Sequence, residues 1–440
     1  MRKSRLQITA ASAFASARSR LVSGMGREMT LCAFGLLVGL SCALPVSADQ
    51  NLVVFDEIAA RVEEQFYDPA MNGLDWENHV ATYRAQIDPE MEAEAFARIV
   101  NDMLGHLDAS HTGIYVRDSP EWYQLAGIFL PGYAALGADL APYLIDGAPI
   151  YAGIGILIER RPEGTFVIGV LDGHPAAEAG VLVGDRIVSV DGAPFHPIRS
   201  FEGRVRQVSQ MTVERRPGDL VSFAVTPVAL DGRTMFQDAM HASARVFERD
   251  GTAIGYIRAW SYAGQSYQDI LTSALLYGVL SETQALVFDL RGGWGGANSS
   301  YLNLFDADSL EMTSIGRDGE ARSFPSAWDR PVVLLIDGGT RSGKEIFAHG
   351  FRTLGLGPIV GETSAGAVLA GRITALVDGT LLYVAVADTR IDNVRLEGQG
   401  VAPDYEVPFD LPFAAGRDPQ LDHAIALAHD LAQEQVDAAP

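Results

Sequence analysis

Ser342 has the surroundings in this chain that best suit nucleophilic chemistry. The apolar run Val332–Ile336 leads into a Gly-rich turn that carries Ser342, and a helical pattern begins directly after it. A serine on such a strand-to-helix turn is exposed beside unpaired helix N–H groups, which can hold negative charge. This placement suits an acyl-transfer nucleophile, although a serine before a helix is more often only an N-cap.

A serine hydroxyl needs a base within hydrogen-bond reach, and His111 is the best candidate by context. His111 lies in a polar turn beside Ser110, directly after an apolar helical pattern. His349 follows the nucleophile on the next helix and is expected to point away from the turn. Two histidines near the C-terminus, His423 and His429, are expected at a helix surface. A histidine in a turn can also be simply solvated.

Backbone N–H donors for an oxyanion are available in two Gly-rich places. The run Gly292-Gly293-Trp294-Gly295-Gly296 follows a strand-like segment, and Gly343 lies next to the nucleophile. We expect Gly343 to act together with Gly295 or Gly296. Phosphate binding is the alternative for this turn, but neither GxxxxGK[ST] nor GxGxxG is present here.

Three charged residues near these turns are assigned no chemical role. Asp289 and Arg291 precede the Gly-rich run and are expected to shape it. Lys344, two residues after the nucleophile, is expected at the surface or in a substrate subsite, because nothing in the sequence predicts that its ammonium is desolvated.

The elements that must position these residues form an α/β layer at residues 245–412. Helical patterns lie between several strand-like runs. The expected strands are Ala253–Ile257, Ala285–Leu290, Val332–Ile336, Ile359–Val360 and Leu381–Val386. Both Gly-rich turns come directly after strands, and active sites in such sheets gather at the carboxyl ends of strands.

Apolar stripes at helical spacing predict an N-terminal helical segment over residues 49–116, which carries Ser110 and His111. Two helices are expected there, over residues 54–66 and 96–107. Residues 117–150 have a weak pattern and are expected to form a long loop or short helices, a candidate flap over the site. Residues 413–440 are expected to form a C-terminal helix and tail.

Residues 151–230 have the pattern of a separate β-rich module. A GIGI run, a short helix signal at 175–180 and the turns GD and DG follow one another in the order of a PDZ domain, which this segment resembles. A PDZ groove binds an extended peptide by strand addition and often holds the C-terminus of a polypeptide. The resemblance places the peptide-binding backbone at Gly153, Ile154, Gly155 and Ile156. The alternative is a module that only packs against its neighbour.

Composition limits the classes of function. The chain has 440 residues, enough for two or three domains, and its formal charge of −23 disfavours a nucleic-acid partner. Both cysteines, Cys32 and Cys42, lie in the first 48 residues, so the rest has no disulfide or thiol nucleophile. No HExxH motif and no Cys/His cluster occur, so neither a metal nor a cofactor is expected.

Residues 1–48 have the pattern of a signal peptide. Six basic residues come first, an apolar stretch follows from about Met29 to Leu44, and small residues at Val46 and Ala48 mark a cleavage site. We therefore expect an exported protein, periplasmic or extracellular, with no integral membrane span after cleavage. The alternative is an uncleaved segment that anchors the protein to a membrane.

Taken together, these segments resemble the S41 serine peptidases, the C-terminal processing or tail-specific proteases. The resemblance covers residues 52–410 and includes DASHT, DLRGGWGG, LIDGGTRSGKEIFAHGF, GETSAG and EGQGVAPD. It implies a ClpP/crotonase-like peptidase core with an inserted PDZ domain. Ala367 stands where one branch of the family has a catalytic lysine, so that dyad is absent. The tricorn-like branch instead uses a Ser-His-Ser-Glu tetrad, which matches Ser110, His111, Ser342 and Glu397.

The resemblance implies a role for each member of the tetrad. Ser342 attacks a peptide carbonyl, His111 acts as the base, and Glu397 orients the imidazole through Ser110. A polypeptide is the implied substrate, bound in part through its C-terminus. Two other hypotheses remain at this point: a catalytically silent PDZ-containing scaffold that binds peptides, and a small-molecule binder on the same fold.

Overall fold

The computed structural model describes residues 50–306, 312–324 and 326–438. The expected signal peptide lies outside these residues. In the described ranges, no helix combines the length and the apolar character needed to cross a membrane. The described residues belong to one compact unit.

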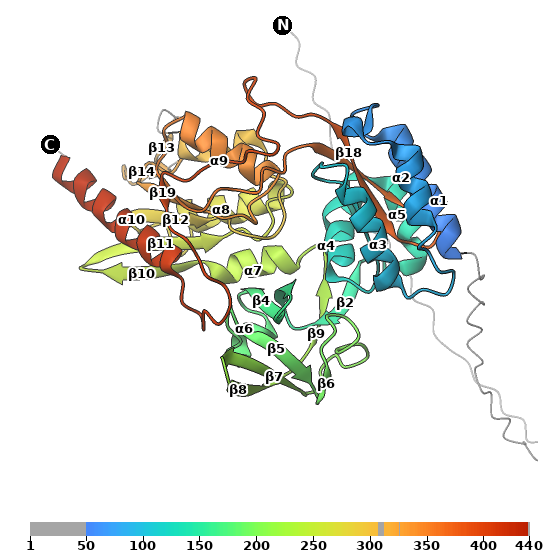
Figure 1. Cartoon of the computed structure of the whole chain (residues 1–440). Coiled ribbons are helices and arrows are strands. Elements are labelled where there is room, and N and C mark those ends of the chain that lie inside the picture. The colour runs from blue at the N-terminus through green and yellow to red at the C-terminus, as the bar shows by residue number, and fades with distance from the viewer. Residues whose placement is uncertain (1–49, 307–311, 325, 439–440) are drawn as a thin grey trace, which may run out of the picture. The chain divides into compact units, whose positions relative to one another are not determined.

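A six-stranded sheet forms the centre of the C-terminal half (Figure 1). Its strand order is β10-β11-β12-β15-β16-β19, with β10 antiparallel to β11 and the remaining pairs parallel. The strands are β10 (Arg245–Arg249), β11 (Thr252–Arg258), β12 (Ala285–Asp289), β15 (Val332–Ile336), β16 (Ile359–Gly361) and β19 (Tyr405–Glu406). Because parallel strands end at the same edge, the segments that follow β12, β15 and β16 come together there.

Helices cover both faces of this sheet, as an α/β layer requires. Alternate residues of β12 show the two faces: Phe288 packs in a cluster with Phe347 of α9, whereas Val287 packs in a cluster with Ala428 of α10. The elements around the sheet are α7 (Met235–Ser243), α8 (Gln265–Leu276), η4 (Ser299–Phe305), β13 (Met312–Ile315), β14 (Ala321–Phe324), α9 (Gly343–Thr353) and α10 (Pro419–Ala438).

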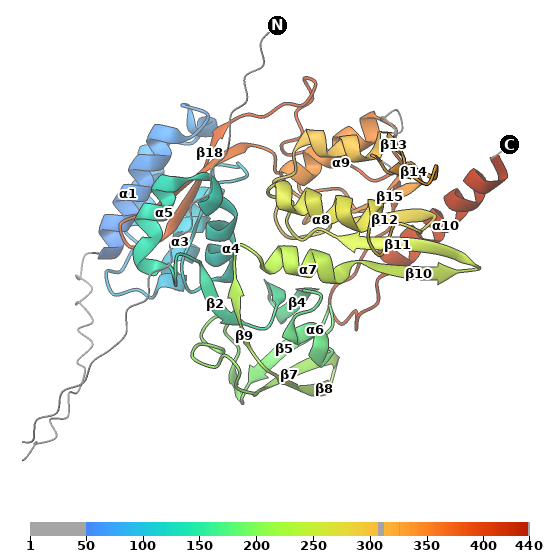
Figure 2. The ribbon, with the colours of Figure 1, turned by 180° about the vertical axis from the view of Figure 1, so that it is seen from behind.

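The expected strand Leu381–Val386 forms, but it does not join the central sheet. It is β18 (Leu381–Ala387), which pairs with β17 (Ala370–Ala375) and with β1 (Gly113–Tyr115) in a separate antiparallel sheet. Its apolar run reflects burial on two sides: Leu382 packs among the N-terminal helices, and Leu381 packs among α4 and α5. Figure 2 shows β18 beside α1 and α5. Residues 110–111 lie shortly before β1, so this pairing places them beside the C-terminal half of the chain.

The N-terminal segment has one helix more than expected. The helices are α1 (Gln50–Gln65), α2 (Trp76–Arg84) and α3 (Ala93–Gly105). Helix α2 has a weak apolar pattern in the sequence because only Trp76 and Tyr83 are buried in it. Asp75 caps α2 by accepting a hydrogen bond from the Asn78 N–H at 3.3 Å.

Residues 117–150 form short helices, which is the second of the two expected alternatives. They form α4 (Pro120–Phe129) and α5 (Ala134–Leu140) with the 3₁₀ turns η2 (Leu130–Gly132) and η3 (Ala141–Tyr143). Glycine and proline at the helix ends interrupt the helical spacing of apolar residues in this part of the sequence. The inner face is nevertheless buried, because Trp122 and Leu125 pack against Leu381 of β18.

The β-rich module over residues 151–230 has strands and a helix in the expected places. Its five main strands form a sheet in the order β3-β4-β5-β7-β8, which leaves β3 at an edge. The elements are β2 (Ile150–Gly153), β3 (Ile156–Arg161), β4 (Gly164–Val170), α6 (Pro175–Ala179), β5 (Arg186–Val190), β6 (Ala193–Pro194), β7 (Ser209–Arg216), β8 (Asp219–Val225) and β9 (Val228–Asp231). Strand β2 pairs with β9, and together they join the module to the rest.

A leucine in β18 tests the docking of the N-terminal segment. Leu382 is 1% exposed, and we expect Leu382→Ala to lower the free energy of unfolding by about 2–5 kcal/mol, as cavities of this kind do. Val377, in the turn that joins β17 to β18, is 67% exposed and supplies the control, because Val377→Ala should stay within about 0.5 kcal/mol of the parent. Urea unfolding measures both. Equal effects of the two variants would contradict this account of β18.

Candidate active site

The turn that carries Ser342 is held in an unusual backbone conformation. Ser342 has φ 58° and ψ −130° at the N-terminus of α9, a region that costs a non-glycine residue on the order of 1–3 kcal/mol. Its N–H donates to the Ala367 carbonyl at 2.8 Å and to Glu345 Oε2 at 3.0 Å. These contacts fix a strained serine at the start of a helix, where its side chain borders a cavity.

Glu345 is a buried organiser of this turn. Its carboxylate accepts hydrogen bonds from the Ser342 N–H, the Ser364 hydroxyl and the N–H groups of Gly366 and Ala367, at 2.6–3.0 Å. Glu345 therefore ties the turn that carries Ser342 to the loop after β16. Our reading of the sequence missed this residue, although the Ser342-x-x-Glu345 spacing is that of a capping box.

A second carboxylate, Glu397, begins a hydrogen-bonded relay to His111. Glu397 Oε1 accepts from the Ser110 N–H, and Oε2 accepts from the Ser110 hydroxyl, both at 2.9 Å. The Ser110 Oγ lies 2.9 Å from His111 Nδ1. Glu397 Oε2 also accepts from the N–H groups of Val368 and Leu369 at 2.6 and 3.1 Å. The structure thus brings together three of the four predicted tetrad residues by direct contacts.

The direction of this relay fixes the tautomer of His111. The Ser110 hydroxyl has one proton, which it donates in a hydrogen bond to Glu397. Ser110 Oγ must therefore accept a hydrogen bond from His111 Nδ1–H. The neutral ring then has its lone pair on Nε2, the atom a base would use. Burial and the nearby Arg341 guanidinium lower the pKa of His111 to about 4, while Glu397 acts to raise it.

Ser342 and His111 line one cavity of about 1030 Å³. Tyr383 of β18 also lines it, and its ring meets His111 edge to face with 5.2 Å between centroids. Within the described residues, no hydrogen bond joins the Ser342 side chain to His111. Such contacts are often long before substrate binds. His349 does not line this cavity, as expected from its place on α9.

The Gly-rich loop packs closely against the turn that carries Ser342. A Cβ added to Gly295 would lie 2.5 Å from the Ser342 Cβ, and one added to Gly343 would lie 2.4 Å from the Ala297 N. Only glycine fits at either place without a shift of the backbone. The N–H groups of Gly295, Gly296 and Gly343 donate to no acceptor in the described part of the protein. These are the three glycines that the sequence predicted as oxyanion donors.

Lys344 is fully buried, so the prediction of a surface or subsite residue is wrong. Its Nζ donates to the carbonyls of Trp260, Leu290 and Gly292 at 3.1, 3.3 and 2.9 Å. Burial and the nearby Arg258 guanidinium lower the pKa of Lys344 to about 7. Three carbonyl acceptors nevertheless match the three donors of an ammonium. Through its bond to Gly292, Lys344 thus fixes the start of the Gly-rich loop.

Asp289 and Arg291 are structural, in agreement with the prediction that they shape this loop. Arg291 forms a buried ion pair with Asp289 at 2.7 Å and a second one with Asp418 at 2.8 Å. Desolvation opposes the charged form of Asp289, but the arginines beside it hold its pKa well below the usual range. The pair therefore fixes the end of β12 against the segment that leads into α10.

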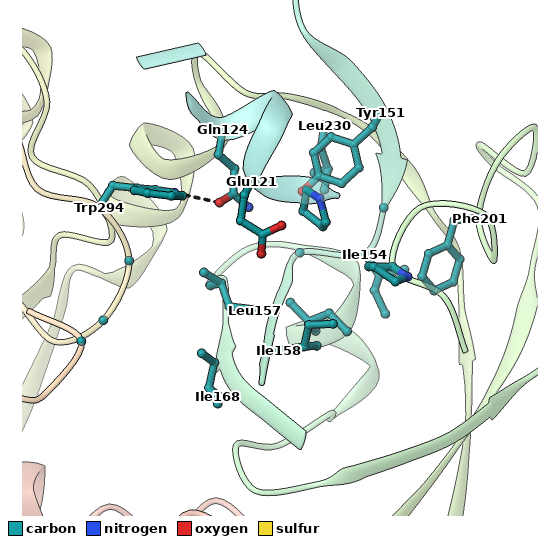
Figure 3. A pocket seen from close by; sticks show the side chains of 18 of the residues that line it. Glu121, Gln124, Tyr151, Ile154, Leu157, Ile158, Ile168, Phe201, Leu230 and Trp294 are labelled. Carbon is teal, nitrogen blue, oxygen red and sulfur yellow. Dashed lines mark hydrogen bonds between the residues drawn. The ribbon is translucent and has the colours of Figure 1, made fainter. Parts of the chain in front are cut away.

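A second cavity, of about 240 Å³, lies along the edge strand of the β-rich module (Figure 3). Its lining includes the predicted peptide-binding residues Gly153, Ile154, Gly155 and Ile156. The N–H groups of Ile154 and Gly155 donate to no acceptor in the ranges that the structure describes. Free backbone donors beside an unpaired strand edge are what an extended peptide needs.

The two cavities share a wall made of Trp294 and Arg341. The Trp294 indole N–H donates to Gln124 Oε1 of α4 at 2.8 Å, as the dashed line in Figure 3 marks. The Arg341 guanidinium lies 5.9 Å from the centroid of the Trp294 ring. The Gly-rich loop thus has one side toward Ser342 and the other toward the second cavity.

Three family models match the protein in sequence order. The tricorn protease C1 domain matches residues 48–105, the PDZ domain matches residues 152–226, and peptidase family S41 matches residues 253–407. The last match contains Ser342, Glu397 and the Gly-rich loop, whereas Ser110 and His111 fall between the first two.

Curated relatives include two kinds of protease. A putative tricorn protease homolog 2 of Streptomyces coelicolor is 28% identical over 407 residues, which cover 88% of this chain and 33% of the relative. A carboxyl-terminal-processing protease of Synechocystis sp. is 24% identical over 433 residues, which cover 92% of this chain and 95% of the relative. The chain thus spans about a third of the length of the tricorn homologues that it matches.

A solved structure supports the same fold. The crystal structure of the tricorn protease aligns with 87% of this chain and 37% of its own, at 19% identity and a TM-score of 0.52. A tricorn C1 segment and a PDZ domain precede an S41 domain along the sequence, so residues 253–407 are identified as an S41 peptidase domain.

Proposed function

We propose that the protein is a serine endopeptidase of the C-terminal processing type. The observation that carries this proposal is the Glu397–Ser110–His111 relay, whose free Nε2 belongs to a ring that lines the same cavity as Ser342. A silent scaffold would not need a relay that fixes the tautomer of a buried histidine. The protease names of the relatives agree with this proposal.

The proposed reaction has two acyl-transfer steps. Ser342 Oγ attacks the substrate carbonyl carbon while its proton passes to His111 Nε2. The N–H of Gly343, with that of Gly295 or Gly296, holds the oxyanion. The C–N bond then breaks, and His111 gives the proton to the leaving amine. Water attacks the acyl ester with His111 as base, which releases the acid and returns a proton to Ser342.

The PDZ groove is proposed to bind the substrate polypeptide. Its free N–H groups at Ile154 and Gly155 suit the carboxylate at the C-terminus of a polypeptide, and the edge strand β3 can add a peptide strand. Export to the periplasm or cell exterior is also proposed. It rests on the basic and apolar pattern of residues 1–48, which ends in small residues.

Cleavage of an unstructured protein by residues 49–440 is the direct test. We expect Ser342→Ala and His111→Ala each to lower the rate at least about 10³-fold, because the serine and its base act as a unit. Mass spectrometry of the fragments measures the cleavage rate and identifies the cleavage sites. Circular dichroism shows whether each variant is folded. Cleavage that survives Ser342→Ala would refute the proposal. Tight binding of C-terminal peptides without cleavage would favour the scaffold.

The pH dependence of kcat/KM tests the base. His111 must be neutral to take a proton, and its pKa is lowered to about 4, so activity should fall only as the pH drops through about 4. Glu397→Gln removes a charge that raises this pKa, so it should move the acid limb to lower pH as well as lowering the rate. Glu406→Gln, at an exposed position, is the matched control and should leave the limb in place. An acid limb near the ordinary histidine value, about 6.5, would contradict the lowered pKa, and a limb that Glu397→Gln leaves in place would contradict the coupling of Glu397 to His111.

A further inference from the structure

Arg341 is a cation without an anionic partner beside the nucleophile. Its Nε is buried and has no hydrogen-bond partner. Among the residues that the structure describes, its guanidinium takes part in no ion pair. Its side chain does contact the face of Trp294, but an aromatic ring does not neutralise its charge. A partly buried cation left in this state is costly unless a ligand supplies the anion.

The cavity around Ser342 is lined without any acidic residue among the described residues, although the protein has 56 acidic and 33 basic side chains. Two arginines line it, Arg233 and Arg341. Arg233 already has a partner, because it pairs with Asp231 at 2.6 Å. Glu121 lines the adjoining peptide groove, but no ion pair joins it to Arg341. Among the described residues that line the cavity, Arg341 therefore supplies the positive charge that is available to pair with a substrate.

We propose that Arg341 selects substrates that place a carboxylate within one or two residues of the scissile bond. The guanidinium belongs to the residue directly before the nucleophile, so its reach covers the substrate positions next to the attacked carbonyl. Its planar fork suits a carboxylate, which it can bind through two parallel hydrogen bonds. The carboxylate comes from an Asp or Glu side chain or from a free C-terminus. This inference rests on the proposed peptidase function and adds its substrate class.

Binding such a substrate would also favour catalysis. The positive charge of Arg341 is among the causes that lower the pKa of His111. A carboxylate on Arg341 offsets that charge, so the imidazolium that forms during attack is more stable when an acidic substrate is in place than when a neutral one is. Selectivity is then expected in kcat as well as in KM.

Peptide series with Glu, Gln or Lys at each position around a cleaved bond test the proposal. A charge-assisted hydrogen bond contributes about 1.5–3 kcal/mol, so Glu should be preferred over Gln about 10- to 100-fold in kcat/KM at one position. Arg341→Gln should abolish that preference, and Arg341→Glu should turn it toward Lys. Arg233→Gln is the matched control and should keep the preference for Glu. Amidated and free peptides separate a C-terminal carboxylate from a side-chain carboxylate as the group that is bound.

Binding to the Ser342→Ala variant separates this proposal from the proposed function. Fluorescence anisotropy of labelled Glu and Gln peptides reads the preference without turnover, and Arg341→Gln in the same background should remove it. Binding that prefers Glu, with no cleavage by the parent protein, would refute the peptidase and leave the carboxylate site standing. Equal binding and equal cleavage of Glu and Gln peptides would overturn the proposal, as would a Glu preference that survives Arg341→Gln.

Discussion

The carboxylate of Glu397 is the interaction on which the geometry of the site depends. It accepts hydrogen bonds from both the backbone and the hydroxyl of Ser110 and from two N–H groups that lead into β17. Three segments, which are far apart in the sequence, therefore converge on one carboxylate. Because the Ser110 proton points to Glu397, the orientation and tautomer of His111 follow from this single contact. The pairing of β1 with β18 supplies the scaffold that keeps Ser110 within reach.

Glu345 fixes the backbone around Ser342, much as Glu397 fixes the position of Ser110 and His111. Its carboxylate collects four donors from the serine turn and the loop after β16, and these contacts offset the strained backbone of Ser342. Lys344 donates hydrogen bonds to three backbone carbonyls at and beside the start of the Gly-rich loop, and so fixes this loop in place. Two carboxylates and one lysine thus fix the backbone around the site. The glycine N–H groups and His111 Nε2 stay free for a substrate.

The parts of the structure that the sequence predicted are those with strong local signals. The strand Val332–Ile336 has the predicted bounds, and a helix begins directly after Ser342 as expected. The pairing of β18 could not be predicted, because burial between two helical layers produces the same apolar run as a strand in a parallel sheet. The burial of Lys344 could not be predicted either. Its three acceptors are backbone carbonyls, which every residue has, so no residue type in the sequence marks them. The resemblance to S41 peptidases supplied Glu397, which local patterns do not distinguish.

The separation of Ser110 and Glu397 along the sequence has a consequence for biosynthesis. Their contact spans 287 residues, with the whole PDZ domain and most of the S41 domain between them. At ribosomal rates of about 5–20 residues per second, the relay stays incomplete for roughly 15–60 s after His111 is made. A nascent polypeptide therefore carries its nucleophile turn before its base is oriented. If the chain acts as the proposed peptidase, the order of synthesis by itself delays its activity until Glu397 has been made.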